Sequence, residues 1–276
     1  MKTIFKYYII NDIIKEFLNT EPDLGKAYSI NTKINKIYKI VVDHPLPHSI
    51  TIDHFPNNFN ENEIKITLDI KDNEVNKKIY FLCNNKKSNK VPNYINELNS
   101  ENTELFIESS KQNYQQYFIP SKKGKYDIIL KFKKYFKNCS YMFYSCKQII
   151  RVDFSNFKTK EVTDMSHLFH SCIKLKELNL SNLNTENVKN MSNMFSKCTK
   201  LSIFNTSSFN IENVNNMEEM FLNCRNLKNI DFSSTIASHN LKKTNIFEGC
   251  WNFEKLKLNK LSKEKFKNEK LNIEYV

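Results

Sequence analysis

Apolar residues recur with a fixed period through the second half of the chain. Cysteines stand 26 residues apart, and before most of them the order Val, Met, Met or Leu, Phe, Cys returns with the same spacing. Such a period predicts a repeat architecture, because stacked units bury a core that one unit cannot bury alone. The five cysteines in register are Cys146, Cys172, Cys198, Cys224 and Cys250.

Each repeat has two hydrophobic patterns. From Val188 to Leu201 the apolar positions are separated by steps of three, three, one, three and three, which is typical of one side of a helix. Leu178 and Leu180 instead alternate with polar residues, as in a half-buried strand. The pattern therefore predicts one strand and one helix per repeat, with parallel strands stacked into a solenoid.

The repeat motif resembles a known family. The string Leu175-x-x-Leu178-x-Leu180-x-x-Leu183 resembles a leucine-rich repeat, and Asn-Val-x-Asn-Met-x-x-Met-Phe-x-x-Cys, ending at Cys198, is similar to the BspA-type leucine-rich repeat surface proteins of mycoplasmas, other bacteria and protists. The resemblance covers residues 139–260 and implies a surface or adhesion role. The last unit, which ends at Cys250, lacks both methionines, as expected of a terminal repeat.

The remaining segments complete the expected organisation. Residues 1–34 read as an amphipathic helical segment, 35–138 as a β-rich module that caps the solenoid, and 261–276 as a C-terminal tail. Within the module we expect the strand at 127–132 to extend the repeat sheet, and Cys139 to begin a partial first helix. The predicted fold is thus α/β, a leucine-rich-repeat-like solenoid with a β-rich cap. Strands are expected at 64–70, 79–83, 104–107, 114–119 and 126–133.

Glycine is scarce, and its scarcity excludes some chemistry. The chain has 3 glycines, all isolated, so it lacks the P-loop and the glycine-rich dinucleotide motif. Asparagines in the turns at 182–187 and 210–213 are expected to take left-handed conformations in place of glycine.

The net charge of +12 is spread evenly along the chain. Arg151 and Arg225 are its only arginines, so the bidentate forks that read guanine or clamp phosphate are scarce and specific nucleic-acid recognition is not expected. Lysine-driven, nonspecific association with nucleic acid or an anionic membrane stays open. No apolar run predicts a transmembrane segment, and no signal-peptide cleavage site follows the N-terminal residues, which favours an intracellular location over the surface one that the resemblance implies.

Motifs for catalysis or metal binding are weak. The 7 cysteines include no Cys-x-x-Cys pair, so we expect buried free thiols and no zinc site. His44 and His48 lie in a proline-containing loop without a ligand pattern, and His167 and His170 match polar surface positions of the next repeat. We expect no enzyme activity, cofactor or metal, and only a role for His44 or His48 would restore a catalytic hypothesis.

The strand face offers a binding surface. Polar residues that alternate with the core positions would form a regular ladder, as in proteins that hold an extended partner. The predicted function is a non-enzymatic interaction module for a protein or glycan ligand, with an intracellular protein–protein scaffold as the alternative. The candidate ligand-binding residues are Arg151, Asp153, Glu177, Asn179, Asn205, Asn229 and Asp231.

Overall fold

The structure is a computed structural model that describes residues 62–83, 93–202, 205–206, 208–266 and 273–275. The chain divides into two units, residues 1–57 and 58–276, and every described residue belongs to the second. The helical segment expected at 1–34 lies outside the described residues.

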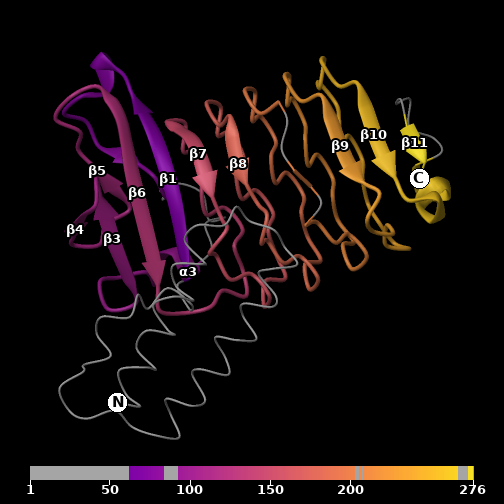
Figure 1. Ribbon diagram of the computed structural model, residues 1–276, viewed down its shortest axis with the longest axis horizontal. Coiled ribbons are helices and arrows are strands. Elements are labelled where there is room, and N and C mark those ends of the chain that lie inside the picture. The colour runs from indigo at the N-terminus through magenta and orange to yellow at the C-terminus, as the bar shows by residue number, and fades with distance from the viewer. Residues whose placement is uncertain (1–61, 84–92, 203–204, 207, 267–272, 276) are drawn as a thin grey trace, which may run out of the picture. The chain divides into compact units, whose positions relative to one another are not determined.

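A six-stranded sheet joins the N-terminal strands to the first repeats (Figure 1). β1 pairs antiparallel with both β6 and β7, and β7 pairs parallel with β8. The strand predicted at 127–132, now β6, does extend the sheet of the first repeats, but it joins that sheet through β1, which lies beside the repeats with Ile66 opposite Val152. In spatial order the strands are β4 (Ser110–Gln112), β3 (Thr103–Ile107), β6 (Gly124–Phe132), β1 (Glu63–Ile70), β7 (Ile149–Asp153) and β8 (Glu177–Asn179).

Alternating side chains explain these strands. In β1, Ile64, Ile66 and Leu68 are buried while Lys65 between them is exposed, so one face packs on the core. The strands predicted at 64–70, 104–107 and 126–133 are confirmed, and those at 79–83 and 114–119 are shorter than predicted. The shorter pair is β2 (Ile79–Tyr80) and β5 (Tyr117–Phe118), and η2 (Asp72–Glu74) and α3 (Asn93–Asn96) complete this part.

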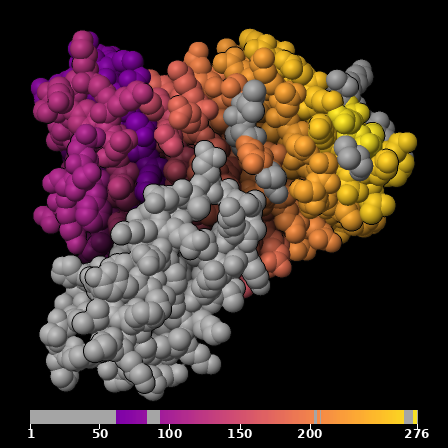
Figure 2. All heavy atoms as spheres, in the orientation of Figure 1, coloured from indigo at the N-terminus to yellow at the C-terminus, as the bar shows by residue number. Residues whose placement is uncertain are grey.

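The last repeats form a second, parallel sheet of β9 (Asn229–Phe232), β10 (Lys255–Leu258) and β11 (Ile273–Tyr275). Lys255 lies opposite Asn229, so residues 26 apart in the sequence are neighbours across the sheet. η3 (Lys260–Ser262) and α4 (Lys263–Phe266) lie between β10 and β11. The repeats follow one another in chain order, which the change of colour toward yellow shows in Figure 2.

The segments predicted to be repeat helices are chains of turns. Tyr141 and Ser145 have φ of 63° and 60°, and the equivalent positions of the later repeats are also left-handed. The amide of Met142 bonds locally to the Cys139 carbonyl at 3.4 Å, whereas the amide of Tyr141 bonds to the Ser166 carbonyl of the next repeat at 3.0 Å. The equivalent left-handed residues are His167, Ser171, Asn193, Lys197, Glu219, Asn223, Asn245 and Gly249.

The predicted strand-plus-helix solenoid is therefore wrong. The described residues contain two α-helices, α3 and α4, and both lie outside the repeats at 139–260. An α-helix needs each amide to bond four residues back, but here every second amide bonds to the neighbouring repeat. The partial helix expected at Cys139 is likewise a turn.

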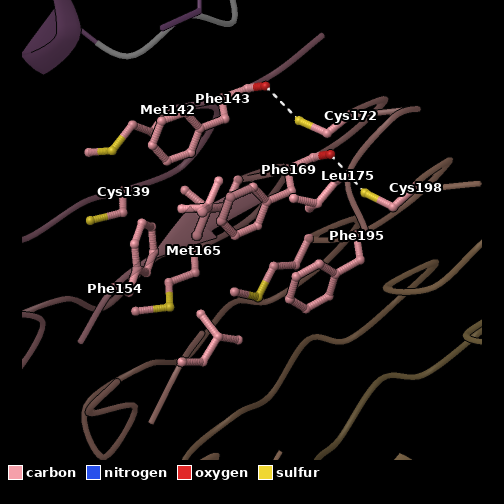
Figure 3. Packing of buried hydrophobic residues seen from close by; sticks show 14 of the residues in the cluster. Cys139, Met142, Phe143, Phe154, Met165, Phe169, Cys172, Leu175, Phe195 and Cys198 are labelled. Carbon is pink, nitrogen blue, oxygen red and sulfur yellow. Dashed lines mark hydrogen bonds between the residues drawn. The ribbon is translucent and has the colours of Figure 1, made fainter. Parts of the chain in front are cut away.

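The repeats share one apolar core. Phe143, Phe169 and Phe195 stack with ring centroids 5.3 and 5.6 Å apart (Figure 3). The column continues through Phe221 and Phe247. Each stacked pair adds about 0.5–1.5 kcal/mol to the burial of its rings. Isolated parallel β-bridges also connect equivalent backbone positions of successive repeats, namely Asn138, Asp164, Asn190, Asn216 and Lys242.

The turn asparagines have a different role from the one predicted. None of those at 182–187 and 210–213 has a positive φ. Their side chains bond to the preceding repeat instead: the amides of Asn182 and Asn187 donate to the carbonyls of Ser155 and Lys160, each at 2.8 Å. Asparagine therefore joins repeats here, and it does not replace glycine in these turns.

Candidate binding surface on the repeat strands

The candidate surface is the outward face of the repeat strands. In β7, Val152 is buried while Arg151 is 55% exposed, and Glu177 lies opposite Arg151 in β8 with 70% exposure. The Arg151 Nη1 and Glu177 Oε2 atoms are 3.8 Å apart. Because both side chains are exposed, they are accessible to a partner. An exposed ion pair at this distance also contributes little to the stability of the fold.

Two predicted ligand residues are engaged in turns. The Asp153 Oδ1 atom accepts hydrogen bonds from the Ser155 amide at 2.8 Å and from the Asn179 side chain at 3.0 Å. Burial alone would raise the pKa of Asp153, but the bonds from Ser155 and Asn179, with Arg151 nearby, hold it below its usual value. The Asn179 Oδ1 atom accepts from the Ser181 amide at 3.1 Å. Asp153 and Asn179 thus end their strands and tie two repeats together.

The polar strand residues of the later repeats also fall into two groups, those that bond to a turn and those that face outward. The Asp231 Oδ1 atom accepts hydrogen bonds from the amide and the hydroxyl of Ser233, so this carboxylate holds the turn that follows β9. Asn229 is exposed beside buried Ile230, and Asn205 is exposed on the preceding repeat. The outward groups of the surface are therefore Arg151, Glu177 and Asn229, whereas Asn205 lies at the repeat position of Asp153, Asn179 and Asp231.

A local signal in the sequence identifies the turn-forming residues. Asp153, Asn179, Asn205 and Asp231 are each followed two residues later by serine, and an Asx side chain commonly bonds to the amide two positions on. Their position on the outward face of the strand, taken alone, predicts ligand binding, whereas the serine that follows indicates a turn.

A cluster of histidine and tyrosine rings was not predicted. His167 stacks on Tyr141 with centroids 4.5 Å apart, and His170 stacks on Tyr144 at 4.9 Å. Burial, with smaller contributions from His167 and Lys197, lowers the pKa of His170 from 6.5 to about 4. The two histidines are half-buried packing groups, where the sequence suggested exposed polar ones.

The cysteines lie inside the repeats as predicted. Cys139, Cys146, Cys172, Cys198 and Cys224 are at most 2% exposed, and Cys250 is half-buried. Burial raises the pKa of the Cys172 thiol well above its usual range, which suits a small apolar group better than a nucleophile.

The described residues contain neither a cluster of metal ligands nor a membrane-spanning helix. In that part of the chain no three His, Cys, Asp or Glu side chains come together as metal ligands would, and none of its helices is long and apolar enough to cross a membrane. His44 and His48 lie outside the described residues.

These observations define a β-rich protein organised around 26-residue repeats with a polar, exposed strand face. Residues 137–260, a little under half of the chain, are similar to the family described as Mycoplasma protein of unknown function, DUF285. Neither the curated proteins nor the solved structures contain a match to this chain.

Proposed function

We propose that residues 137–260 form a non-enzymatic binding module that holds a protein or glycan partner on its strand face. The observation that carries the proposal is the exposed Arg151–Glu177 pair on neighbouring strands whose opposite face is core. A later repeat adds exposed Asn229 at the position equivalent to Arg151 and Glu177, so charged and amide groups recur along the face. Such a row suits an extended partner that bonds to several strands in turn.

The loose geometry of the ion pair supports a binding role. At 3.8 Å and in contact with water, Arg151 and Glu177 lose little when a partner separates them. A guanidinium beside a carboxylate can then bond to both an acceptor and a donor on the partner.

The similarity to BspA-type proteins favours a surface or adhesion role for this module, and the intracellular scaffold is the competing assignment. Fractionation of cells that express the full chain would separate the two. A protein that external protease cleaves on intact cells has the surface role, whereas one protected until lysis is a scaffold.

The test of the binding face uses the full chain as bait and a purified partner. A protein captured from extracts is identified, purified and titrated by calorimetry against wild type, Arg151→Ala/Glu177→Ala and Asn229→Ala. We expect the double variant to weaken binding by roughly tenfold or more, as is usual for residues that contribute much of the binding energy of an interface. The matched control is Lys158→Ala/Lys160→Ala on the loop after β7. A double variant that binds as tightly as the control would refute the proposal.

A further inference from the structure

Loops that precede the repeat strands carry a concentration of positive charge. We name residues 147–150, 173–176, 199–202, 225–228 and 251–254 the pre-strand loops; together they hold six basic residues and one acidic residue. The five segments that follow the strands, 155–160, 181–186, 207–212, 233–238 and 259–264, hold four basic and three acidic residues. The positive charge therefore gathers on one side of the strands, although it is even along the sequence.

Consecutive pre-strand loops are bonded to each other. The amide of Lys176 donates to the Ile150 carbonyl at 2.9 Å, and the amide of Lys228 donates to the Ser202 carbonyl at 3.0 Å. The Thr199 hydroxyl bonds to the Ile173 carbonyl at 3.2 Å, and the Asn252 amide bonds to the Arg225 carbonyl at 3.3 Å. Successive loops thus lie about one strand spacing apart, roughly 5 Å, and their charges form a line.

Several of these cations have no acidic partner among the described residues. Lys174 lies 3.7 Å from Glu74, and Lys228 lies 3.5 Å from Glu254. Within the described part of the chain, no ion pair engages the remaining four, which are exposed: Lys147, Lys176, Lys200 and Arg225. Of these, Lys176 lies close enough to Asp69 to help lower the pKa of that carboxyl. Uncompensated cations in a line attract a polyanion.

An exposed aromatic ring ends the line. Trp251, the single tryptophan of the chain, is 73% exposed on the last pre-strand loop. The Arg225 guanidinium carbon lies 4.5 Å from the centre of its ring, so a cation and an aromatic surface stand side by side.

We propose that the pre-strand loops bind a linear acidic polysaccharide. The ammonium groups of Lys147, Lys176 and Lys200 and the Arg225 guanidinium pair with its sulfate or carboxylate groups, and Trp251 packs against the C–H face of one sugar ring. This surface is distinct from Arg151, Glu177, Asn205 and Asn229 on the strand face, so it is a second binding function.

Other polyanions fit the surface less well. Single-stranded nucleic acid is held by a succession of aromatic platforms, and the pre-strand loops expose one such ring. An anionic membrane favours several apolar side chains at the contact, but Leu175, Leu201 and Leu227 on these loops are fully buried, and the large exposed ones are Trp251 and, at 38%, Ile173. Lysine point charges beside a single exposed aromatic ring, that of Trp251, suit an acidic sugar chain.

The experiment titrates the full chain by calorimetry with a size-defined heparin oligosaccharide, and with neutral dextran, poly(dT) and phosphatidylserine vesicles, at about 150 mM salt. The variants are Lys147→Gln/Lys176→Gln/Lys200→Gln and Trp251→Ala. The control, Lys158→Gln/Lys160→Gln/Lys189→Gln, removes the same charge from outside the pre-strand loops. The fluorescence of the single tryptophan reports directly on the proposed site.

We expect heparin to change the tryptophan fluorescence of wild type and control, and the pre-strand triple variant to bind roughly tenfold more weakly. Trp251→Ala should weaken binding several-fold while the circular dichroism spectrum is unchanged. Equal loss in both triple variants would show that net charge alone drives binding and would overturn the proposal. So would unchanged fluorescence on binding, or tighter binding to poly(dT) or vesicles than to heparin.

Discussion

The thiol of Cys198 donates a hydrogen bond to the backbone carbonyl of Phe169, which lies in the preceding repeat, at a distance of 3.1 Å (Figure 3). The same carbonyl accepts the Cys172 amide at 3.0 Å within its own repeat. Equivalent thiol bonds run from Cys172 to Phe143 and from Cys224 to Phe195. The cysteine column therefore binds each repeat to the one before it.

Replacing Cys198 with alanine should lower the free energy of unfolding by about 1–2 kcal/mol, because a buried sulfur is lost and a small cavity stays behind. The Phe169 carbonyl keeps its bond from the Cys172 amide, so no orphaned acceptor adds to the cost. Urea denaturation followed by circular dichroism measures the difference. The half-buried Cys250→Ala is the control and should cost less; equal losses would contradict the packing argument.

Thiol reactivity should separate Cys250 from the other cysteines. Cys250 is half-buried, whereas Cys146 and Cys172 are fully buried and burial raises their pKa. Iodoacetamide applied to the folded protein at about pH 8 should modify Cys250 first, as peptide mass spectrometry can show. The fast phase should vanish in Cys250→Ser. Equal labelling of Cys172 in the folded state would be incompatible with its burial.

Gly249→Ala should be more costly than a similar change at an equivalent turn. Gly249 has φ of +71°, and an added Cβ would meet the Asn223 side-chain oxygen of the previous repeat. We expect a loss of about 1–3 kcal/mol from the left-handed backbone and this contact. Ser145→Ala, where φ is already 60°, is the matched control. The double variant Gly249→Ala/Asn223→Ala should recover part of the loss in thermal unfolding.

His170 should make the fold less stable in acid. Its pKa is about 4 in the folded protein, below the usual 6.5, chiefly because burial disfavours the charged ring. The unfolded chain therefore binds the proton first, and stability falls as the pH drops from about 6.5 to about 4. Since the ring is partly exposed and water screens it, we expect about 1–2 kcal/mol.

The test compares wild type with His170→Ser, which places at this position the residue type of Ser196 in the next repeat. Unfolding in urea at several pH values isolates the histidine, because the carboxylates titrate in both proteins. The variant should lose less stability than wild type across this range. Parallel pH profiles would show that the ring is not held neutral by the fold.

Much of the fold could be predicted from the sequence, because buried positions recur at fixed intervals along it. The alternation in β1 predicted its buried face, and the spacing of 26 predicted that Lys255 lies beside Asn229. The core position of Phe195 followed in the same way, since a residue that is buried in one repeat is buried in the next. Which polar strand residues face a partner was predicted less well, because Asp153 and Asp231 form turns.

The sequence by itself determined the period, the buried columns and the strands, because these depend on which side chains avoid water. Only the tertiary structure decided the backbone between Cys139 and Cys146 and its equivalents. There a helix and a chain of alternating left-handed turns bury the same residues, and they differ in where the amides bond. The amide of Tyr141 reaches a carbonyl of the next repeat, a partner that exists only once the repeats are stacked.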